Sequence, residues 1–432
     1  AVVEERQLEQ FANRGYDVLD KIRALDPSVS LSMSIGIGRG ARTLREAQDM
    51  AEHALDMAQG RGGDQAAEMT LDGFTFYGGV SHGVEKRSKV RSRLVADQLV
   101  KLIKEADHVV IMGHRMSDLD AIGAAEGVLR ICKICDVPAV IAVRRDATLA
   151  ASLIDALCKA GQKDDFIDPK DALPIISKRT LCIVVDTYQA GLVESKDILE
   201  KCGKVAVIDH HRKGVGYIEN PALVCHEPYS SSASELVTEL LQYVGERDDK
   251  PNRVEAEGLL AGILLDTQDF TLHTGVRTFE AAAALRRYGA ETERVRRLFD
   301  VTMVEYNAKA DLVEKAQMYK NCAISIGGEV APEARVAIAQ AANDLLRIQG
   351  VDASFVAVQV GNGVNVSARS MGAVNVQVIM ESLGGGGHQT MAAAQLKHIT
   401  PQAARSRIQD AIDQYYLSQK KTTPEARPAK GE

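Results

Sequence analysis

The 432-residue sequence contains no tryptophan, and aromatic residues make up only 4% of it. It also contains no uninterrupted apolar run of about 18 residues, the length that indicates a candidate transmembrane helix. No charged and then apolar leader opens the sequence, so we expect no secretion signal. Hydrophobic residues at 45% and charged residues at 26% are typical of a folded globular chain. We therefore expect a soluble protein of about three domains.

Positive charge is also scarce, because 52 Lys and Arg residues face 59 Asp and Glu residues and the net charge is -7. Proteins that bind long nucleic acids usually carry the opposite sign, so that function is disfavoured. The seven cysteines are odd in number and lie in apolar segments, which favours reduced thiols in a core. Cys132 and Cys135 have the spacing of half a zinc site, but no second pair follows them. We interpret them as buried thiols on a helix.

The first 106 residues indicate the end of one domain and a connector. Residues 1–67 predict a helical stretch, a short strand at 31–37, and a helix at 43–58 with alanine and leucine at helical spacing. This segment is too small to be a complete α/β domain. Residues 68–106 are of mixed composition and lead into a helix at 91–104, so we interpret them as a connector.

Residues 107–320 have a different pattern, in which short apolar runs alternate with helices. The runs are mostly β-branched and lie at 109–112, 139–143, 181–185 and 205–208. Such runs favour strands buried on both faces, and hence a mostly parallel sheet flanked by helices. The predicted fold class is therefore α/β, with a mainly helical stretch at 251–320.

A second and smaller α/β domain is predicted at residues 321–419. We expect it to contain a helix at 340–349 and strands at 323–326, 334–339, 353–360 and 362–370. The tail, residues 420–432, is charged and shows no apolar periodicity. We therefore expect the tail to be disordered.

Acidic and imidazole side chains follow the apolar runs of the first α/β domain. They are His114, Asp118 and Asp120 after the first run, Asp186 after the third, Asp209, His210 and His211 after the fourth, and Asp266 after a helical stretch at 259–265. In an open parallel sheet the carboxyl ends of the strands border the ligand crevice. Each signal alone is weak, since a lone Asp in such a place is more often a helix cap. Together they indicate a metal site, because like charges in one cleft need a cation.

Oxygen and imidazole ligands without a thiolate favour Mn²⁺ or Mg²⁺ over a structural zinc ion. Two such ions can clamp the attacking and leaving oxygens of a phosphoryl displacement, so the predicted reaction is hydrolysis of a phosphoester or phosphoanhydride. The second α/β domain adds an anion-binding element, with Arg369 on a strand and four glycines plus His388 before a helix expected at 391–394. Arginine and closely approaching backbone N–H groups both bind phosphate.

The motifs that carry these residues resemble those of a known family. GHRMSDLDAIGA, VVDT, IDHHR and LLDTQDF resemble the DHH phosphoesterase superfamily, and NVSARS with GGGGHQTMAA resembles its DHH-associated C-terminal domain. Upstream, REAQDMAEHALDMAQGRGGDQAAE is similar to the last third of a degenerate GGDEF domain. FTFYGGVSHGVEKRSKVRSR is similar to the connector of GdpP-type cyclic-di-AMP phosphodiesterases. The resemblance implies a partial GGDEF domain at 1–67, a DHH domain at 107–320 and, across a cleft, a DHH-associated domain at 321–419.

That resemblance also implies roles for individual residues. One Mn²⁺ ion would be held by His114, Asp118 and Asp186, and the other by Asp120, Asp186, His210 and Asp266. His211 would lie near the scissile phosphate, and Asp209 would orient the metal-bound histidine. The non-reacting phosphate and the adenosine would be held by Arg369, Gly384, Gly385, Gly386, Gly387 and His388. The implied reaction is attack of an activated water on cyclic-di-AMP, which opens it to linear pApA.

The nearest alternative is a DHH-type hydrolase of short oligonucleotides such as pApA or pAp, because the metal ligands would contact only phosphate. The GGDEF remnant and its connector favour the cyclic-dinucleotide enzyme. The glycine run followed by histidine disfavours an inorganic pyrophosphatase, and the complete ligand set disfavours a sensor without activity. The resemblance further implies a homodimer and, in bacterial signalling, a place at the cytoplasmic side of the cell membrane through segments outside this chain.

Overall fold

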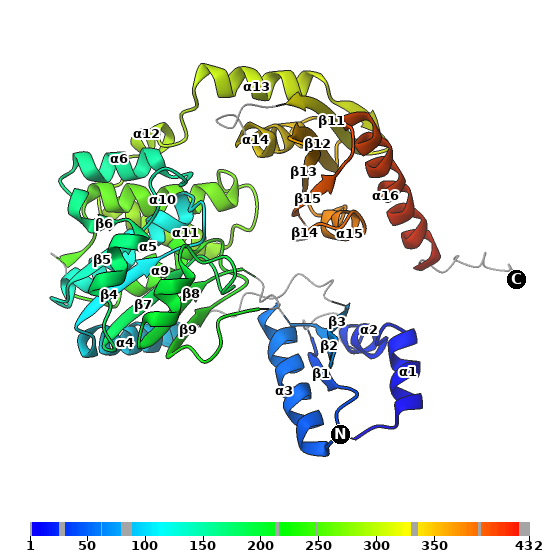
Figure 1. Ribbon diagram of the computed structural model, residues 1–432, viewed down its shortest axis with the longest axis horizontal. Helices are drawn as coiled ribbons and strands as arrows, with labels where there is room; N and C mark the ends of the chain where they lie inside the picture. The colour runs from blue at the N-terminus through cyan, green and yellow to red at the C-terminus, as the bar shows by residue number, and fades with distance from the viewer. Residues whose placement is uncertain are drawn as a thin grey trace, which may run out of the picture. The chain divides into compact units, whose positions relative to one another are not determined.

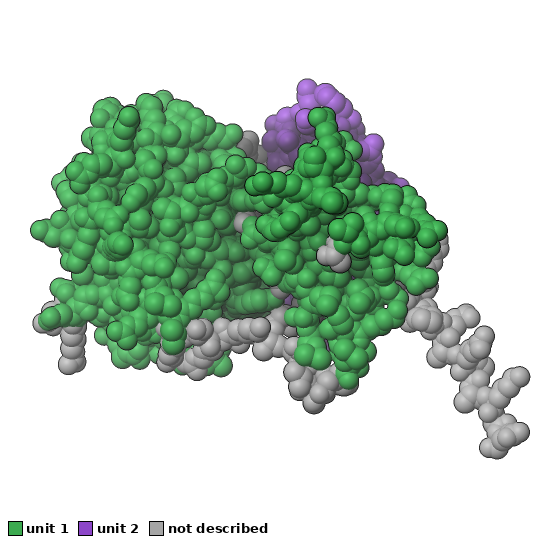
Figure 2. Space-filling view, turned by 90° about the horizontal axis from the view of Figure 1, so that it is seen from below, with its two compact units in different colours: residues 1–299 green, residues 300–432 purple. Residues whose placement is uncertain are grey.

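The computed structural model describes residues 2–25, 31–61, 63–78, 89–211, 216–246, 249–329, 336–387 and 390–422. The chain, whose helices and strands are labelled in Figure 1, divides into two compact units, residues 1–299 and 300–432 (Figure 2). This division lies before the predicted boundary at residue 320, because helix α13 (Met303–Glu314) packs against elements of the second unit. Among the described helices, none combines the length and the apolar character needed to cross a membrane.

The N-terminal part contains more structure than the sequence predicted. Strands β1 (Ile35–Gly38), β2 (Gln65–Thr70) and β3 (Gly73–Gly78) form one sheet. The predicted boundary at residue 67 is wrong because it cuts β2, and residues 68–78 belong to this sheet rather than to a connector. The sequence analysis overlooked this hairpin, although Asp72-Gly73 at its turn is a recognised hairpin signal. The accompanying helices are α1 (Glu5–Asn13), α2 (Val18–Arg23) and α3 (Leu44–Gly60).

A six-stranded parallel sheet forms the centre of the first unit, as predicted. Its strand order is β6-β5-β4-β7-β8-β9. The order reverses between β4 and β7, and ligands of open α/β sheets bind beyond the carboxyl ends of the strands at such a switch point. The strands are β4 (His108–Met112), β5 (Ala139–Ala142), β6 (Phe166–Ile167), β7 (Thr180–Val185), β8 (Lys204–Asp209) and β9 (Leu223–His226).

Both faces of this sheet are covered, which explains its continuous apolar strands (Figure 1). Val109 and Ile111 face a large core, whereas Val110 and Met112 face a smaller one. The large core contains α4 (Lys89–Glu105), α5 (Leu119–Ile134), α6 (Ala151–Lys159), α9 (Ala233–Leu241), α10 (Arg253–Thr267), α11 (Val276–Arg287) and α12 (Thr292–Arg297). The smaller core contains α7 (Pro169–Ala172) and α8 (Lys196–Lys201). Cys132 is a buried free thiol on α5, as predicted, whereas Cys135 is the C-cap of α5 and is only half-buried.

The second unit contains a mixed six-stranded sheet in the order β10-β11-β12-β13-β15-β14. Helices α13 and α14 (Val336–Leu345) cover one face, and α15 (Val376–Ser382) and α16 (Pro401–Thr422) cover the other. The strands are β10 (Gln317–Tyr319), β11 (Cys322–Glu329), β12 (Ala353–Val360), β13 (Gly363–Ser370), β14 (Gly386–Gly387) and β15 (Met391–Lys397).

Three predictions for this unit are wrong. Residues 336–339, predicted to be part of a strand, begin α14, while 334 and 335 lie outside the described residues. Residues 391–394, predicted to be a helix, begin β15. Their small side chains conceal a period of two, in which Ala392 and Ala394 are buried and Met391 and Ala393 are exposed. Residues 420–422 of the predicted disordered tail end α16, and the rest of the tail lies outside the described residues.

A buried polar cluster lies between α5 and α10. Glu126 is 1% exposed, and its carboxylate accepts a hydrogen bond from Gln162 at 3.4 Å. Gln162 also donates to Glu255 at 2.8 Å, and Glu255 forms a bidentate pair with Arg130. Burial, together with the charges of Glu255 and Asp165, raises the pKa of Glu126 to about 8. The folded chain therefore holds Glu126 largely in its protonated form at neutral pH.

We predict that Glu126→Gln stabilises the chain at alkaline pH. Between 4.5, the ordinary pKa, and about 8, the folded state holds a proton that the unfolded state has lost, so stability falls as the pH rises through this window. The neutral glutamine avoids that loss, and the gain in unfolding free energy should be roughly 1–3 kcal/mol larger at pH 8 than at pH 5. Thermal unfolding at both pH values measures the difference. An equal gain at the two pH values would contradict this account.

Candidate metal centre

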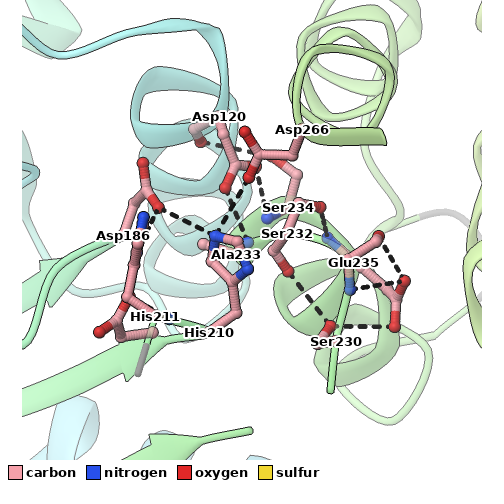
Figure 3. A network of polar contacts seen from close by, with 12 residues as sticks. Asp120, Asp186, His210, His211, Ser230, Ser232, Ala233, Ser234, Glu235 and Asp266 are labelled. Atoms are coloured by element: carbon pink, nitrogen blue, oxygen red, sulfur yellow. Dashed lines mark hydrogen bonds and ion pairs between the residues drawn. The ribbon is translucent and has the colours of Figure 1, made fainter. Parts of the chain in front are cut away.

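Side chains from three neighbouring strand ends meet at the carboxyl edge of the parallel sheet. His114 lies two residues after β4, Asp186 directly follows β7, and His210 and His211 directly follow β8. Because β4, β7 and β8 are adjacent and parallel, their carboxyl ends open on the same side. Figure 3 shows the side chains of Asp186, His210 and His211 close together. The structure therefore brings these predicted residues into one place.

The remaining acidic residues come from two helix ends. Asp118 is the N-cap of α5, and its Oδ1 accepts hydrogen bonds from the backbone N–H groups of Asp120 at 3.0 Å and Ala121 at 3.1 Å. Asp120 lies in the first turn of α5 and is fully buried. Asp266 lies in the last turn of α10. Two helices thus add three carboxylates to the strand-end residues.

Three overlapping groups of side chains have the spacing of a metal site, with the ligand atoms of each group within 4.8 Å of one another. Two of them are the sets that the resemblance implied, one with His114, Asp118 and Asp186, and one with Asp120, Asp186, His210 and Asp266. The third combines Asp186 and His210 with His211. Because Asp186 belongs to all three groups, it has the position of a ligand that bridges two ions.

The ring of His114 has the orientation of a metal ligand. Its Nδ1 lies 2.8 Å from the backbone oxygen of Arg115 and donates to it. Its Nε2 lies 3.4 Å from Asp186 Oδ2 and 3.8 Å from Asp118 Oδ1. Burial opposes the charged form of His114, but Asp118 and Asp186 raise its pKa to about 11. When a carbonyl fixes one ring proton in this way, the other ring nitrogen can present its lone pair to a metal ion.

The negative charges of this site are poorly balanced by the protein alone. Burial, followed by the charges of Asp186 and Asp266, raises the pKa of Asp120 well above its ordinary value. Burial opposes the charged form of His210, but the carboxylates of Asp186 and Asp266 raise its pKa well above the ordinary value. The carboxylates therefore draw protons into the site. A bound divalent cation would take over the role of those protons.

The buried atoms of the site fit such a cation. Nε2 of His210 lies 3.1 Å from Asp266 Oδ2 and 3.5 Å from Asp186 Oδ1, but neither it nor Asp186 Oδ1 makes a well-directed hydrogen bond to the described residues, and both atoms are buried. Asp186 has a left-handed φ of +58°, which aspartate tolerates and which recurs at functional sites. Its N–H donates to the backbone oxygen of Ile208 at 2.9 Å, and this bond to β8 holds the Asp186 backbone in place. Oxygen and imidazole donors suit Mn²⁺ and Mg²⁺.

A second layer of contacts holds the histidines that follow β8. Asp209 Oδ1 lies 2.9 Å from His211 Nδ1 and also accepts the backbone N–H of His211 at 3.2 Å. Asp209 therefore orients His211. The resemblance had implied that it orients the metal-bound histidine, His210. His226, which ends β9, donates from Nε2 to the backbone oxygen of His211 at 2.6 Å. Sequence reasoning missed His226, because a single histidine at a strand end has no spacing signal.

Arg369 of the second unit lies on β13. Its guanidinium donates to Ser367 Oγ at 3.1 Å and to the backbone oxygen of Ala368 at 2.9 Å. Its Nε is buried and makes no hydrogen bond to the described residues. Burial lowers the pKa of Arg369 to about 10, so the side chain is still charged at neutral pH. A half-buried cation with an unused donor is suited to an anionic ligand.

The four glycines do not precede a helix, which corrects the prediction. Gly386 and Gly387 form β14, which pairs with β15. A Cβ atom would lie 2.2 Å from the β15 backbone at Gly385 and 2.4 Å from it at Gly387, so these two glycines allow close packing on β15. Gly384 and Gly386 face open space. His388 lies outside the described residues.

Three family models match successive parts of the chain. Residues 108–263 match the DHH family, N-terminal domain, and residues 331–417 match the DHHA1 domain. Residues 1–72 match the GGDEF domain described as cyclic-di-AMP phosphodiesterase GdpP-like. The chain therefore contains segments similar to a GdpP-like GGDEF domain, a DHH domain and a DHHA1 domain, in that order.

Several curated relatives carry informative names. The chain is 44% identical to cyclic-di-AMP phosphodiesterase GdpP of Geobacillus thermodenitrificans and 38% identical to cyclic-di-AMP phosphodiesterase PdeA of Listeria monocytogenes. Each match covers 96% of this chain, which spans 64% of the length of either relative. It is also 27% identical to the bifunctional oligoribonuclease and PAP phosphatase NrnA of Thermus thermophilus, over 76% of this chain and 95% of that one.

The solved structures support the fold. The chain matches the crystal structure of an exopolyphosphatase-related protein from Bacteroides fragilis with a TM-score of 0.65. This match covers 76% of this chain and 98% of the other, at 19% identity. At this identity the likeness concerns the arrangement of the helices and strands, not the substrate.

We predict that Asp186→Ala abolishes Mn²⁺ binding at both ligand sets while the chain stays folded. The substitution removes the ligand that all three groups share and relieves the crowding of carboxylates. Asp186→Asn controls for backbone strain, because asparagine tolerates the left-handed conformation. It should also lose most of the Mn²⁺ affinity. Titration calorimetry measures binding, and circular dichroism measures folding. Binding of two Mn²⁺ ions by the alanine variant would refute the bridging role.

Proposed function

We propose that this chain is a metal-dependent phosphodiesterase that hydrolyses cyclic-di-AMP to linear pApA. The observation that carries the proposal is the pair of overlapping ligand sets that share Asp186 at the carboxyl edge of a parallel sheet. The names of the GdpP and PdeA relatives support the choice of substrate, since both relatives align with nearly the whole of this chain.

The proposed chemistry assigns separate tasks to the ions and to the residues. Two bound ions, Mn²⁺ or less effectively Mg²⁺, would supply Lewis-acid stabilisation of the phosphate and a water of lowered pKa. The six proposed ligands, which come from the ends of β4, β7 and β8 and from α5 and α10, would hold the ions and so fix where the reacting phosphate binds. We propose that His211, oriented by Asp209, contacts the scissile phosphate.

Recognition of the rest of the substrate is proposed to come from the second unit. We propose that Arg369 and residues 384–388 bind the non-reacting phosphate and the adenosine. The buried Nε of Arg369 supports this assignment, because it has no hydrogen-bond partner among the described residues. Metal ligands contribute little discrimination between nucleotides, so other groups must supply it.

A second candidate function is hydrolysis of short oligonucleotides such as pApA, or of pAp. The observation that favours it is the likeness to NrnA of Thermus thermophilus, which covers 95% of that relative. The GdpP-like GGDEF segment at residues 1–72 favours the cyclic dinucleotide instead. The two candidates share the metal centre and differ in the substrate that the second unit accepts.

The resemblance to the GdpP-type family alone supports two further proposals. One is that the chain forms a homodimer, and the other is that the family protein works at the cytoplasmic side of the cell membrane. Sedimentation equilibrium of the purified chain tests the first of these. A monomer at micromolar concentration would refute it.

Product analysis tests the proposed function directly. The purified chain with Mn²⁺ is incubated in parallel with cyclic-di-AMP, cyclic-di-GMP and pApA, and the products are separated by chromatography. We expect conversion of cyclic-di-AMP to pApA, at a higher rate with Mn²⁺ than with Mg²⁺, and no conversion after chelation. Turnover of pApA without turnover of cyclic-di-AMP would favour the second candidate. Full activity after exhaustive chelation would refute metal dependence.

We predict that Arg369→Ala raises the KM for cyclic-di-AMP roughly tenfold and changes kcat less, because a charged hydrogen bond to the non-reacting phosphate is lost. Hydrolysis of bis(p-nitrophenyl) phosphate, which has no second phosphate, should change little. Gly386→Val is a companion variant in β14, because a Cβ atom at Gly386 would have no heavy atom within 4 Å and would avoid the backbone collision expected at Gly385. Equal losses on both substrates would mean that Arg369 acts on the reacting phosphate.

A further inference from the structure

Asp120 is fully buried, and the start of helix α9 holds both of its carboxylate oxygens. The backbone N–H of Ala233 lies 2.7 Å from Oδ2, and that of Ser234 lies 2.8 Å from Oδ1. Figure 3 shows this carboxylate facing the two amides. The positive end of the α9 dipole therefore faces this carboxylate and favours its charged form. Each oxygen retains a further lone pair that can bind a cation.

A separate network fixes the point at which α9 begins. Ser232 is the N-cap, and its Oγ accepts the backbone N–H of Glu235 at 3.0 Å. The buried carboxylate of Glu235 in turn accepts hydrogen bonds from Ser230 Oγ at 2.9 Å and Ser231 Oγ at 2.6 Å. None of these four residues belongs to the candidate ligand groups among the described residues. The direction of the two amides is thus set before any ion binds.

Gly262 of α10 closes the third side of the space around Asp120. A Cβ atom at Gly262 would lie 2.6 Å from Asp120 Oδ1, 2.8 Å from Asp120 Cα and 2.3 Å from Ser234 Oγ. Gly262 lies four residues before Asp266, so the two occupy the same face of α10, one turn apart. Any side chain at Gly262 would therefore push on a carboxylate of the metal centre.

We propose that Gly262 and the first turn of α9 are positioning elements of the metal centre, which fix the plane and charge of the Asp120 carboxylate. The two amides orient its oxygens and stabilise its charge away from water. The missing side chain of Gly262 leaves room for that orientation. This inference rests on the proposed function, because it requires Asp120 to be a metal ligand.

The test compares two alanine substitutions on the same helix. Gly262→Ala places a methyl group against the Asp120 carboxylate. Gly258→Ala is the matched control, because its Cβ would meet only the flexible end of Leu153, at 3.0 Å. Removing partners that orient metal ligands typically lowers metal affinity ten- to a hundredfold. We expect a loss of this size in Mn²⁺ affinity by titration calorimetry for Gly262→Ala, and a change under about twofold for Gly258→Ala.

A double variant separates positioning from packing. In Gly262→Ala/Ser234→Ala the shortest collision, with Ser234 Oγ, is gone, whereas the contacts with Asp120 Oδ1 and Asp120 Cα remain. We expect thermal stability to recover in part while Mn²⁺ affinity stays low. Recovery of Mn²⁺ affinity together with stability would overturn the inference, because Gly262 would then matter for packing alone. If Gly262→Ala does not fold, the double variant still carries this comparison.

The results for the unsubstituted chain separate a failure of the proposed function from a failure of the positioning role of Gly262. If the unsubstituted chain binds no Mn²⁺, the proposed function fails, and the inference about Asp120 fails with it. If it binds Mn²⁺ and hydrolyses cyclic-di-AMP, and Gly262→Ala binds as tightly as Gly258→Ala, only the positioning role is overturned. A loss confined to Gly262→Ala and the double variant supports the positioning role.

Discussion

The crowding of carboxylates at one edge of the parallel sheet is the constraint on which the first unit depends. Asp120 and Asp186 are buried, and Asp118 and Asp266 lie close enough to share cations with them. Water cannot solvate these charges fully, and like charges repel strongly in such a place. Protons on the histidines can balance them in part, and divalent cations can balance them fully. Protons and cations therefore compete for the same site.

The topology of the sheet explains how so many ligands reach one place. Strands β4, β7 and β8 are adjacent and parallel, so residues that follow them are neighbours although they are far apart in the sequence. Helices α5 and α9 present their N-terminal ends to the same site, where their dipoles favour negative charge. Helix α10 adds Asp266 from its last turn and leaves room for Asp120 at Gly262. The same strand and helix ends thus bring the carboxylates together and help to stabilise their charge.

The strand-end ligands could be predicted because each follows a β-branched apolar run, and parallel strands bring their carboxyl ends together. The hairpin of β2 and β3 could have been predicted from Asp72-Gly73 at its turn. Strand β15 was missed because alanines hide an alternation of period two. The contacts around Asp120 could not be predicted, since Ala233 and Ser234 donate from backbone N–H groups, which almost every residue has. Gly262 likewise resembles any glycine in an apolar helix until its neighbours are known.

The central proposal is that Asp186 is the ligand that two metal ions would share, since it belongs to each of the overlapping ligand groups. Low-temperature electron paramagnetic resonance of the Mn²⁺-loaded chain tests this claim most directly, because two ions that share a carboxylate couple magnetically. The account predicts the spectrum of an exchange-coupled Mn²⁺ pair, with two ions bound per chain. The isolated six-line spectrum of uncoupled Mn²⁺, at one ion per chain, would contradict it.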